Sequence, residues 1–195
     1  MKKNISQQLL EFIENSPTCF HAVQAMTDIL SAEGFTELKE NQKWHIENGG
    51  RYFVTRNGSS LTAFTVPFQE MKGMHIIASH SDSPSFKIKE NPELESEGHY
   101  IRLNVEGYGG MIRAPWFDRP LSVAGRVIVK DKAQGGFRSI LVDIGRDLVM
   151  IPNLAIHMDR QINDSCKYNI QKDMLPIYGD LSAKGTFMKL IADTA

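Results

Sequence analysis

The stretch HIIASHSDSP, residues 75–84, is the most informative part of the sequence because it joins an apolar run to a potential metal ligand. Residues 74–79 are nearly all apolar, which predicts a strand buried on both faces in the middle of a sheet. His80 follows this run, and Asp82 comes two positions later. Residues two apart in an extended backbone point to the same side, so Asp82 is expected to accept the Nδ1 proton of His80 and leave Nε2 free for a metal. His80 would lie just after the C-terminal end of the predicted strand, and open α/β sheets usually bind their ligands at the C-terminal ends of their strands.

A His-x-Asp pattern is short, and a surface histidine beside a carboxylate produces it without any metal. The residues of this stretch alone therefore leave two interpretations open, a metal site and a surface ion pair. His75, inside the apolar run, is most simply a core histidine.

Two helices are predicted upstream of this strand. Apolar residues recur at helical spacing over residues 5–16, behind Asn4 and Ser6 as possible caps. A second helix is predicted from Thr18 to Gly34, where glycine can adopt the left-handed conformation that ends a helix. Both helices are expected to pack on a sheet.

The remaining elements are mostly short strands. Residues 51–56 and 61–66 alternate in polarity around Asn57-Gly58, which predicts a hairpin. Further strands are expected at 86–89, 99–105, 121–130 and 137–142, with helical spacing returning over 182–195. The acidic, proline-containing stretch 90–98 suggests a boundary, so we expect an α/β segment at 1–93 and a separate β-rich module at 94–195.

Composition excludes several classes of function. The 195 residues, 42% of them hydrophobic, can bury a substantial core. The 22 basic and 23 acidic residues nearly cancel, which argues against a nucleic-acid binder. No run approaches the roughly 20 apolar residues that span a bilayer, so no membrane partner is expected. Cys19 and Cys166 are most simply free thiols, and together with the absence of a signal-peptide pattern they favour a cytoplasmic location.

Four stretches, in order along the chain, resemble the aspartyl aminopeptidase family of dinuclear zinc aminopeptidases. The His-Ser-Asp-Ser-Pro sequence at 80–84 is similar to the first metal-ligand motif of that family. The others are SPTCFHAV at 16–23, YGG at 108–110 with WFDRPL at 116–121 and AGRV at 124–127, and IPNLAIHM at 151–158. This ordered set covers nearly the whole chain and is far more specific than any one motif.

The resemblance implies a fold, a site and a partner. Residues 1–93 would be the N-terminal, incomplete part of a zinc-exopeptidase α/β/α sandwich, and 94–195 an inserted β-rich dimerisation domain. His80 would be a zinc ligand and Asp82 the carboxylate that orients it. His157 would be donated to the active site of a partner subunit, where it can bind the substrate or the developing oxyanion. From the residues alone, His157 is more simply a histidine satisfied within the β-rich module.

The resemblance also implies the reaction. The family removes N-terminal residues from peptides, acidic ones in its best-known members, with two zinc ions per complete site and a glutamate as general base. The remaining ligands follow the dimerisation domain in that family, and this chain has no Glu-Glu dipeptide. We therefore expect the chain alone to bind zinc weakly, to be inactive and to associate into dimers or larger homo-oligomers.

Two alternatives remain open. The chain could belong to another branch of the zinc aminopeptidase and deacylase superfamily, although the YGG and WFDR stretches speak against it. It could instead be a catalytically inactive fragment that acts only as an oligomerisation module.

Trp116 to Arg119 is interpreted as a packed corner with an Asp118–Arg119 ion pair.

Overall fold

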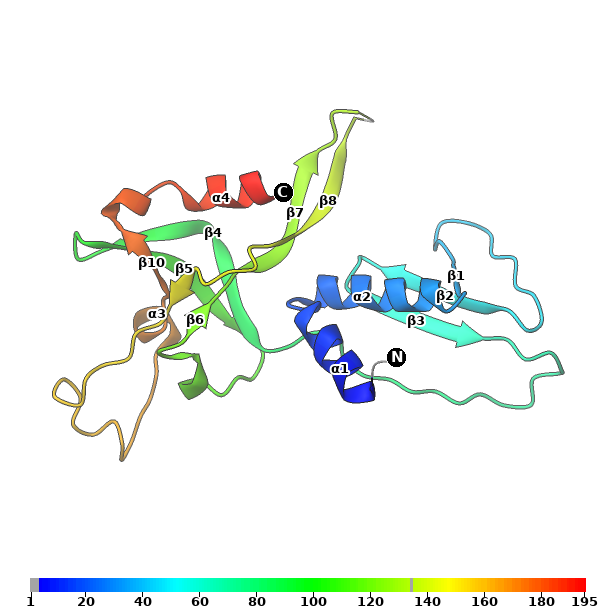
Figure 1. The fold of residues 1–195 in the computed structure, drawn as a ribbon, viewed down its shortest axis with the longest axis horizontal. Coiled ribbons are helices and arrows are strands. Elements are labelled where there is room, and N and C mark those ends of the chain that lie inside the picture. Colours follow the sequence, from blue (N-terminus) through cyan, green and yellow to red (C-terminus); the bar gives the residue numbers. More distant parts are fainter. Residues whose placement is uncertain (1–3, 134) are drawn as a thin grey trace. The chain divides into compact units, whose positions relative to one another are not determined.

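The computed structural model describes residues 4–133 and 135–195, and the chain divides into two compact units between Ser83 and Pro84 (Figure 1). The boundary expected after residue 93 is wrong, because that position lies inside strand β4, Ser85–Ser96. Glu93 pairs with Leu103 of the neighbouring strand β5, so the acidic stretch is part of a sheet and does not act as a linker.

Of the two possible caps of the first helix, Asn4 is the one used and Ser6 lies inside the helix, while the second helix starts next to Thr18 as predicted. Helix α1, Ile5–Glu14, starts with a capping box in which Asn4 and Gln7 satisfy each other's backbone N–H groups. Helix α2, Cys19–Ala32, is capped by the side chain of Thr18. Gly34 follows it with a φ of 78°, a conformation that costs glycine little.

The sheet of the first unit has the order β1-β2-β3. Its strands are β1 at Thr36–Glu37, β2 at Arg51–Arg56 and β3 at Ser60–Thr65. The predicted hairpin is confirmed: Asn57 and Gly58 both have positive φ, 54° and 61°, as a tight turn between twisted strands requires. Helix α2 lies along this hairpin and contacts both of its strands (Figure 1).

The strand predicted over residues 74–79 is not formed. This segment is irregular, and Ile76 and Ile77 are 78% and 100% exposed. His75, expected in the core, is exposed as well. A central strand needs neighbours on both edges to pair its backbone groups, and within the described residues the sheet of this unit stops at β1 and β3. The apolar pattern alone was therefore not enough to make these residues a strand.

The second unit is built on a five-stranded sheet with the order β4-β5-β10-β9-β6. Besides β4, its strands are β5 at Tyr100–Tyr108, β10 at Ile177–Asp180, β9 at Val149–Met150 and β6 at Pro120–Leu121. The pairing of β4 with β5 shifts between Ile88 and Glu93. Pro92 lies in this irregular part, where its missing N–H removes no regular ladder bond.

A two-stranded ribbon and short helices complete the second unit. Strands β7, Ala124–Lys130, and β8, Phe137–Asp143, pair only with each other among the described strands. Residues 121–130 were expected as one strand, but β6 pairs with β9 while β7 pairs with β8, so the chain changes sheets between them. The helical elements are η1 at Ala114–Trp116, α3 at Ile170–Asp173, η2 at Leu181–Ala183 and α4 at Phe187–Thr194.

Two groups of buried side chains stabilise the second unit. One group lies around β5 and α4 and comprises Leu103, Val105, Val149, Leu175 and Phe187. The other holds Phe117, Ile151 and Met174 together.

With helices and sheets in both units, the fold is mixed α/β, as predicted. Among the described helices, none combines the length and apolar character needed to cross a membrane.

Candidate metal ligand and catalytic residues

The structure brings His80 and Asp82 together on the irregular segment after residue 79. Nδ1 of His80 is 2.8 Å from the backbone oxygen of Asp82 and 3.2 Å from its Oδ1. A carbonyl oxygen and an ionised carboxylate only accept hydrogen bonds, so Nδ1 must carry the proton in this arrangement. In the neutral imidazole, Nε2 is then unprotonated, and the ring, with 81% of its surface exposed, presents this nitrogen as a potential metal ligand.

The segment that carries His80 is tied to the β2–β3 hairpin. The Ser81 hydroxyl donates a hydrogen bond of 2.8 Å to the carbonyl oxygen of Ser59, which follows the Asn57-Gly58 turn. The prediction based on strand alternation placed His80 and Asp82 on one side of an extended chain. In the structure they lie on an irregular segment, and Nδ1 of His80 contacts the backbone oxygen of Asp82 as well as its carboxylate. The residue that contacts Nδ1 is nevertheless the one predicted, Asp82.

A catalytic zinc needs more donors than His80 supplies. Such an ion takes about three protein ligands and a water. Within residues 4–133 and 135–195, no group of three or more His, Cys, Asp or Glu side chains is placed to hold a metal. An exposed imidazole with a fixed tautomer fits the role of one zinc ligand, but the described residues do not make a complete site.

His157 belongs to the second unit, on the loop formed by residues 152–169. It is exposed, and it lies in a turn closed by a 2.8 Å hydrogen bond from the Met158 N–H to the Ala155 carbonyl. His157 is therefore not the buried, satisfied histidine that a structural role in the β-rich module would require. Its role in catalysis stays a prediction.

The loop that carries His157 is held at both ends by residues 113–118. At its start, Asp118 Oδ1 accepts the Asn153 N–H at 2.9 Å. At its end, Arg113 donates to the Tyr168 carbonyl, and the Tyr168 ring packs 4.5 Å from that of Phe117. The ion pair expected between Asp118 and Arg119 is not formed among the described residues, and the Asp118 carboxylate instead accepts the Asn153 N–H of the loop.

The end of this loop also carries a perturbed phenol. A side-chain hydrogen bond with Cys166 and, to a smaller extent, burial raise the pKa of Tyr168, and the negative charge of Asp118 acts in the same direction. These contacts favour the neutral phenol of Tyr168 over the phenolate. Cys166, like Cys19, is a free thiol.

Residues 12–189 match the family described as "Aminopeptidase I zinc metalloprotease (M18)". A protein of Clostridium acetobutylicum called a probable M18 family aminopeptidase 2 is 48% identical over 193 residues, which cover 96% of this chain and 45% of that protein. A protein of Pseudomonas aeruginosa with the same description is 42% identical over 186 residues, 93% of this chain and 42% of the relative. The chain thus spans less than half the length of these relatives.

Three solved structures superpose closely on most of this chain. A chain of the Ape4 and Nbr1 complex superposes with a TM-score of 0.89 at 36% identity, over 97% of this chain and 39% of that one. Chaetomium thermophilum mApe1 gives 0.87 at 34% identity, over 97% and 46%. The S. cerevisiae mApe1 dodecamer gives 0.79 at 26% identity, over 98% and 44%.

Proposed function

We propose that this chain, which belongs to the M18 family of aminopeptidase I zinc metalloproteases, provides the N-terminal part of a zinc aminopeptidase that releases acidic residues from the N-termini of peptides. The observation that carries this proposal is the local geometry at His80, whose Nδ1 contacts Asp82 and whose exposed ring leaves Nε2 as the nitrogen available to a metal. A ligand that binds zinc through one ring nitrogen commonly donates its other N–H to a carboxylate or carbonyl.

Three residues of this chain would have separate roles. His80 would hold a zinc ion through Nε2, and Asp82 would fix the tautomer and raise the basicity of the imidazole. His157 would reach the active site of a partner subunit and hydrogen-bond the substrate carbonyl as negative charge develops on it. When bound, the zinc ions would supply Lewis-acid activation of a water and of the scissile carbonyl.

The proposal includes two zinc ions per complete site, a peptide substrate, a homo-oligomer and a cytoplasmic location. The similar S. cerevisiae mApe1 is a dodecamer, which supports an assembly of several subunits. A histidine donated between subunits would make that assembly necessary for catalysis. Because few of the predicted ligands lie in this chain, we propose that the chain alone is inactive and binds zinc weakly.

A chimera tests this function. The aligned portion of the Clostridium acetobutylicum relative, 45% of its length, is replaced with this chain. With zinc, the chimera is expected to hydrolyse Asp- and Glu-substituted chromogenic amides faster than the Leu derivative, and His80→Ala should abolish the activity. A folded, zinc-loaded chimera whose hydrolysis is unaffected by His80→Ala would exclude the proposed role of His80.

The second candidate function is an oligomerisation module without catalysis. It is favoured by the exposed apolar side chains of the β7–β8 ribbon, Ile128 and Phe137, which are 61% and 72% exposed. It also agrees with the lack of a three-ligand group among the described residues. The chimera separates the two functions, since a pure oligomerisation module would assemble normally while His80→Ala and His157→Ala had no effect on hydrolysis.

A further inference from the structure

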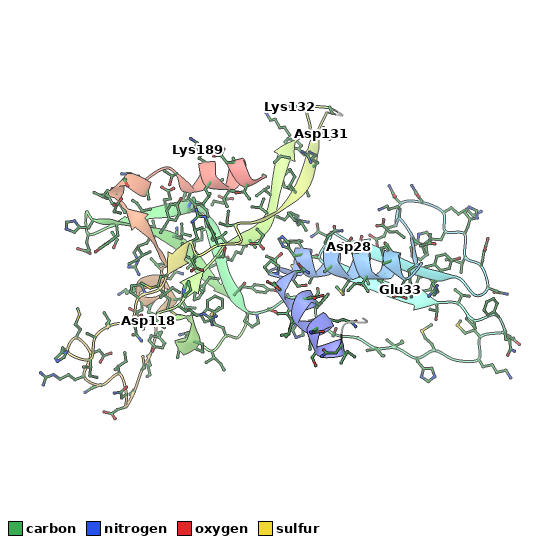
Figure 2. The ribbon with its side chains drawn as sticks, in the orientation of Figure 1. Asp28, Glu33, Asp118, Asp131, Lys132 and Lys189 are labelled. Atoms are coloured by element: carbon green, nitrogen blue, oxygen red, sulfur yellow. The ribbon has the colours of Figure 1, made fainter. Side chains whose placement is uncertain are left out.

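Asp118 has an unusual backbone conformation at the base of the loop that carries His157. Its φ is 54°, in the left-handed region that few residues other than glycine occupy, although aspartate and asparagine do so more readily than most. Figure 2 shows Asp118 near the base of the 152–169 loop, within the second unit. Neighbouring Phe117 is buried, so this conformation is set next to a packed part of the fold.

Two hydrogen bonds made by Asp118 enclose the first residues of the loop. Its N–H donates to the Ile151 carbonyl at 2.9 Å, and its Oδ1 accepts the Asn153 N–H at 2.9 Å. Pro152 lies between them and has no N–H, so Asn153 carries the first backbone donor of the loop. Asp118 therefore forms hydrogen bonds with Ile151 and Asn153, the residues on either side of Pro152, which has no N–H to donate.

The residues beneath this contact are buried and packed together. Ile151 is fully buried and forms a parallel bridge with Phe117, and both pack with Met174. The direction in which the chain leaves Ile151 is consequently fixed relative to a packed core. The side chain that sets this direction is a single carboxylate on the surface.

Few residues separate this anchor from His157. The Leu154 N–H is held by Asn153 Oδ1 at 2.9 Å, and the turn from Ala155 to Met158 follows at once. Only three residues separate Asn153 from His157, so a change of direction at Asn153 would displace the turn that carries the imidazole. A shift of about 1 Å at a catalytic group can cost on the order of 100-fold in rate.

We infer that Asp118 is a positioning residue: its carboxylate and its left-handed backbone fix the exit of the loop at Asn153 and so direct His157. The consequence for catalysis rests on the proposed function, whereas the anchoring itself does not. In this arrangement the aspartate in the WFDRPL stretch serves the loop that carries His157 in addition to the corner it belongs to.

Three substitutions separate the two properties of Asp118. Asp118→Asn keeps an acceptor oxygen and a side chain that tolerates positive φ, so it should preserve the anchor. Asp118→Gly keeps the conformation but removes the acceptor, and Asp118→Ala removes both. Asp143→Ala is the matched control, because Asp143 Oδ1 makes a similar 2.9 Å bond to the Gly145 N–H in a different turn of the same unit.

NMR of the 195-residue chain gives the first readout. In Asp118→Gly and Asp118→Ala, amide exchange at Asn153 and Leu154 should become about tenfold faster, and the His157 ring resonances should move toward those of an unstructured peptide. Asp118→Asn should stay within about twofold of the original rates, and Asp143→Ala should leave the loop unchanged. Exchange of β4 and β5 amides reports on unfolding of the whole unit and should not change.

Unchanged Asn153 exchange in both Asp118→Gly and Asp118→Ala would overturn the anchoring, and so would an Asp118→Asn variant as perturbed as Asp118→Ala. In the chimera, Asp118→Gly should lower kcat more than it changes KM and should add little in a His157→Ala background. A normal kcat in Asp118→Gly, beside a lowered kcat in His157→Ala, would refute the positioning role. If His157→Ala itself has no effect, the proposed role of His157 fails while the measured anchoring stands.

Discussion

The Glu93 carboxylate caps helix α4 from a strand that lies far earlier in the sequence: its Oε1 accepts the Phe187 N–H at 2.8 Å. Its second oxygen accepts the Gly185 N–H, so both oxygens serve the start of the helix. Thr186, at the N-cap position, donates its hydroxyl to Ala183 and makes no cap with its side chain. Glu93 thus replaces a local cap and holds the buried Phe187 against the core of the second unit.

Replacing Glu93 should therefore destabilise the second unit. We expect Glu93→Ala to lower its free energy of unfolding by about 1 kcal/mol, the usual value of a lost helix cap, and Glu93→Gln to lose less because one acceptor remains. Urea unfolding followed through Trp116 measures this, in a Trp44→Phe background that removes the only other tryptophan. Equal stability of the Glu93→Ala and original chains would show that the contact is not an effective cap.

The exposed ion pair of Glu95 and Lys184 predicts a pH dependence. The hydrogen bond from Lys184 lowers the pKa of Glu95 below 4.5, and the same contact raises the pKa of Lys184 above 10.5. Because the pKa of Glu95 is lowered in the folded chain, the ion pair stabilises the fold at pH values above 4.5. This stabilisation is lost as the pH falls through the lower pKa of the folded state. The raised Lys184 pKa acts conversely, with its contribution lost as the pH rises through the folded value.

Melting temperatures of the original chain and Glu95→Gln should consequently differ slightly near pH 7 and converge well below pH 4.5. About 1 M salt should also reduce the difference, because both groups are exposed and screened. A difference that persists in acid would mean that Glu95 acts by packing and not by its charge.

Local signals in the sequence predicted the elements that are stabilised locally. Asn4, Thr18 and the Asn57-Gly58 pair form caps or turns with residues only a few positions away, so their effect can be read from sequence alone. The contact of Glu93 with Phe187 spans 94 residues and leaves no local pattern. For this reason the acidic stretch 90–98 was predicted to hold a domain boundary, although most of it belongs to β4.

The candidate site shows the same division. The proximity of His80 and Asp82 followed from their spacing, and the structure brings them together. The strand expected before them was wrong, because its pairing depends on neighbouring strands that the described residues do not supply. The contact of Asp118 with Asn153 could not be predicted, since it depends on a positive φ and on a partner 35 residues away.

His157 is expected to contribute to the chemical step. In the chimera, His157→Ala should lower kcat by roughly 100- to 1,000-fold with a small change in KM, as expected of a group that stabilises charge developing in the transition state. Steady-state kinetics at saturating zinc measure both constants. His99→Ala serves as the control, because His99 is an exposed histidine of the same unit with no proposed role. A raised KM with an unchanged kcat would assign His157 to substrate binding only.

The exposed apolar side chains of the β7–β8 ribbon should promote self-association. Ile128→Ser and Phe137→Ser are expected to shift the chain toward monomer, because large exposed apolar surfaces usually mark interfaces. Light scattering coupled to size exclusion gives the mass across a concentration series. Lys132→Ser, near the tip of the same ribbon (Figure 2), is the control for a change that removes no apolar surface. Unchanged mass in both apolar variants would exclude the ribbon as an interface.

The proposed function depends above all on His80 being a zinc ligand that Asp82 orients, and ¹⁵N NMR of the histidine rings during a zinc titration of the chain tests this. We expect Nε2 of His80 to shift as zinc is added while Nδ1 keeps its proton. Asp82→Ala should weaken this response by less than the roughly 10- to 100-fold loss that follows removal of an orienting partner, because the backbone oxygen of residue 82 still accepts the Nδ1 proton. Zinc that shifts other histidines while leaving His80 Nε2 unchanged would contradict the assignment.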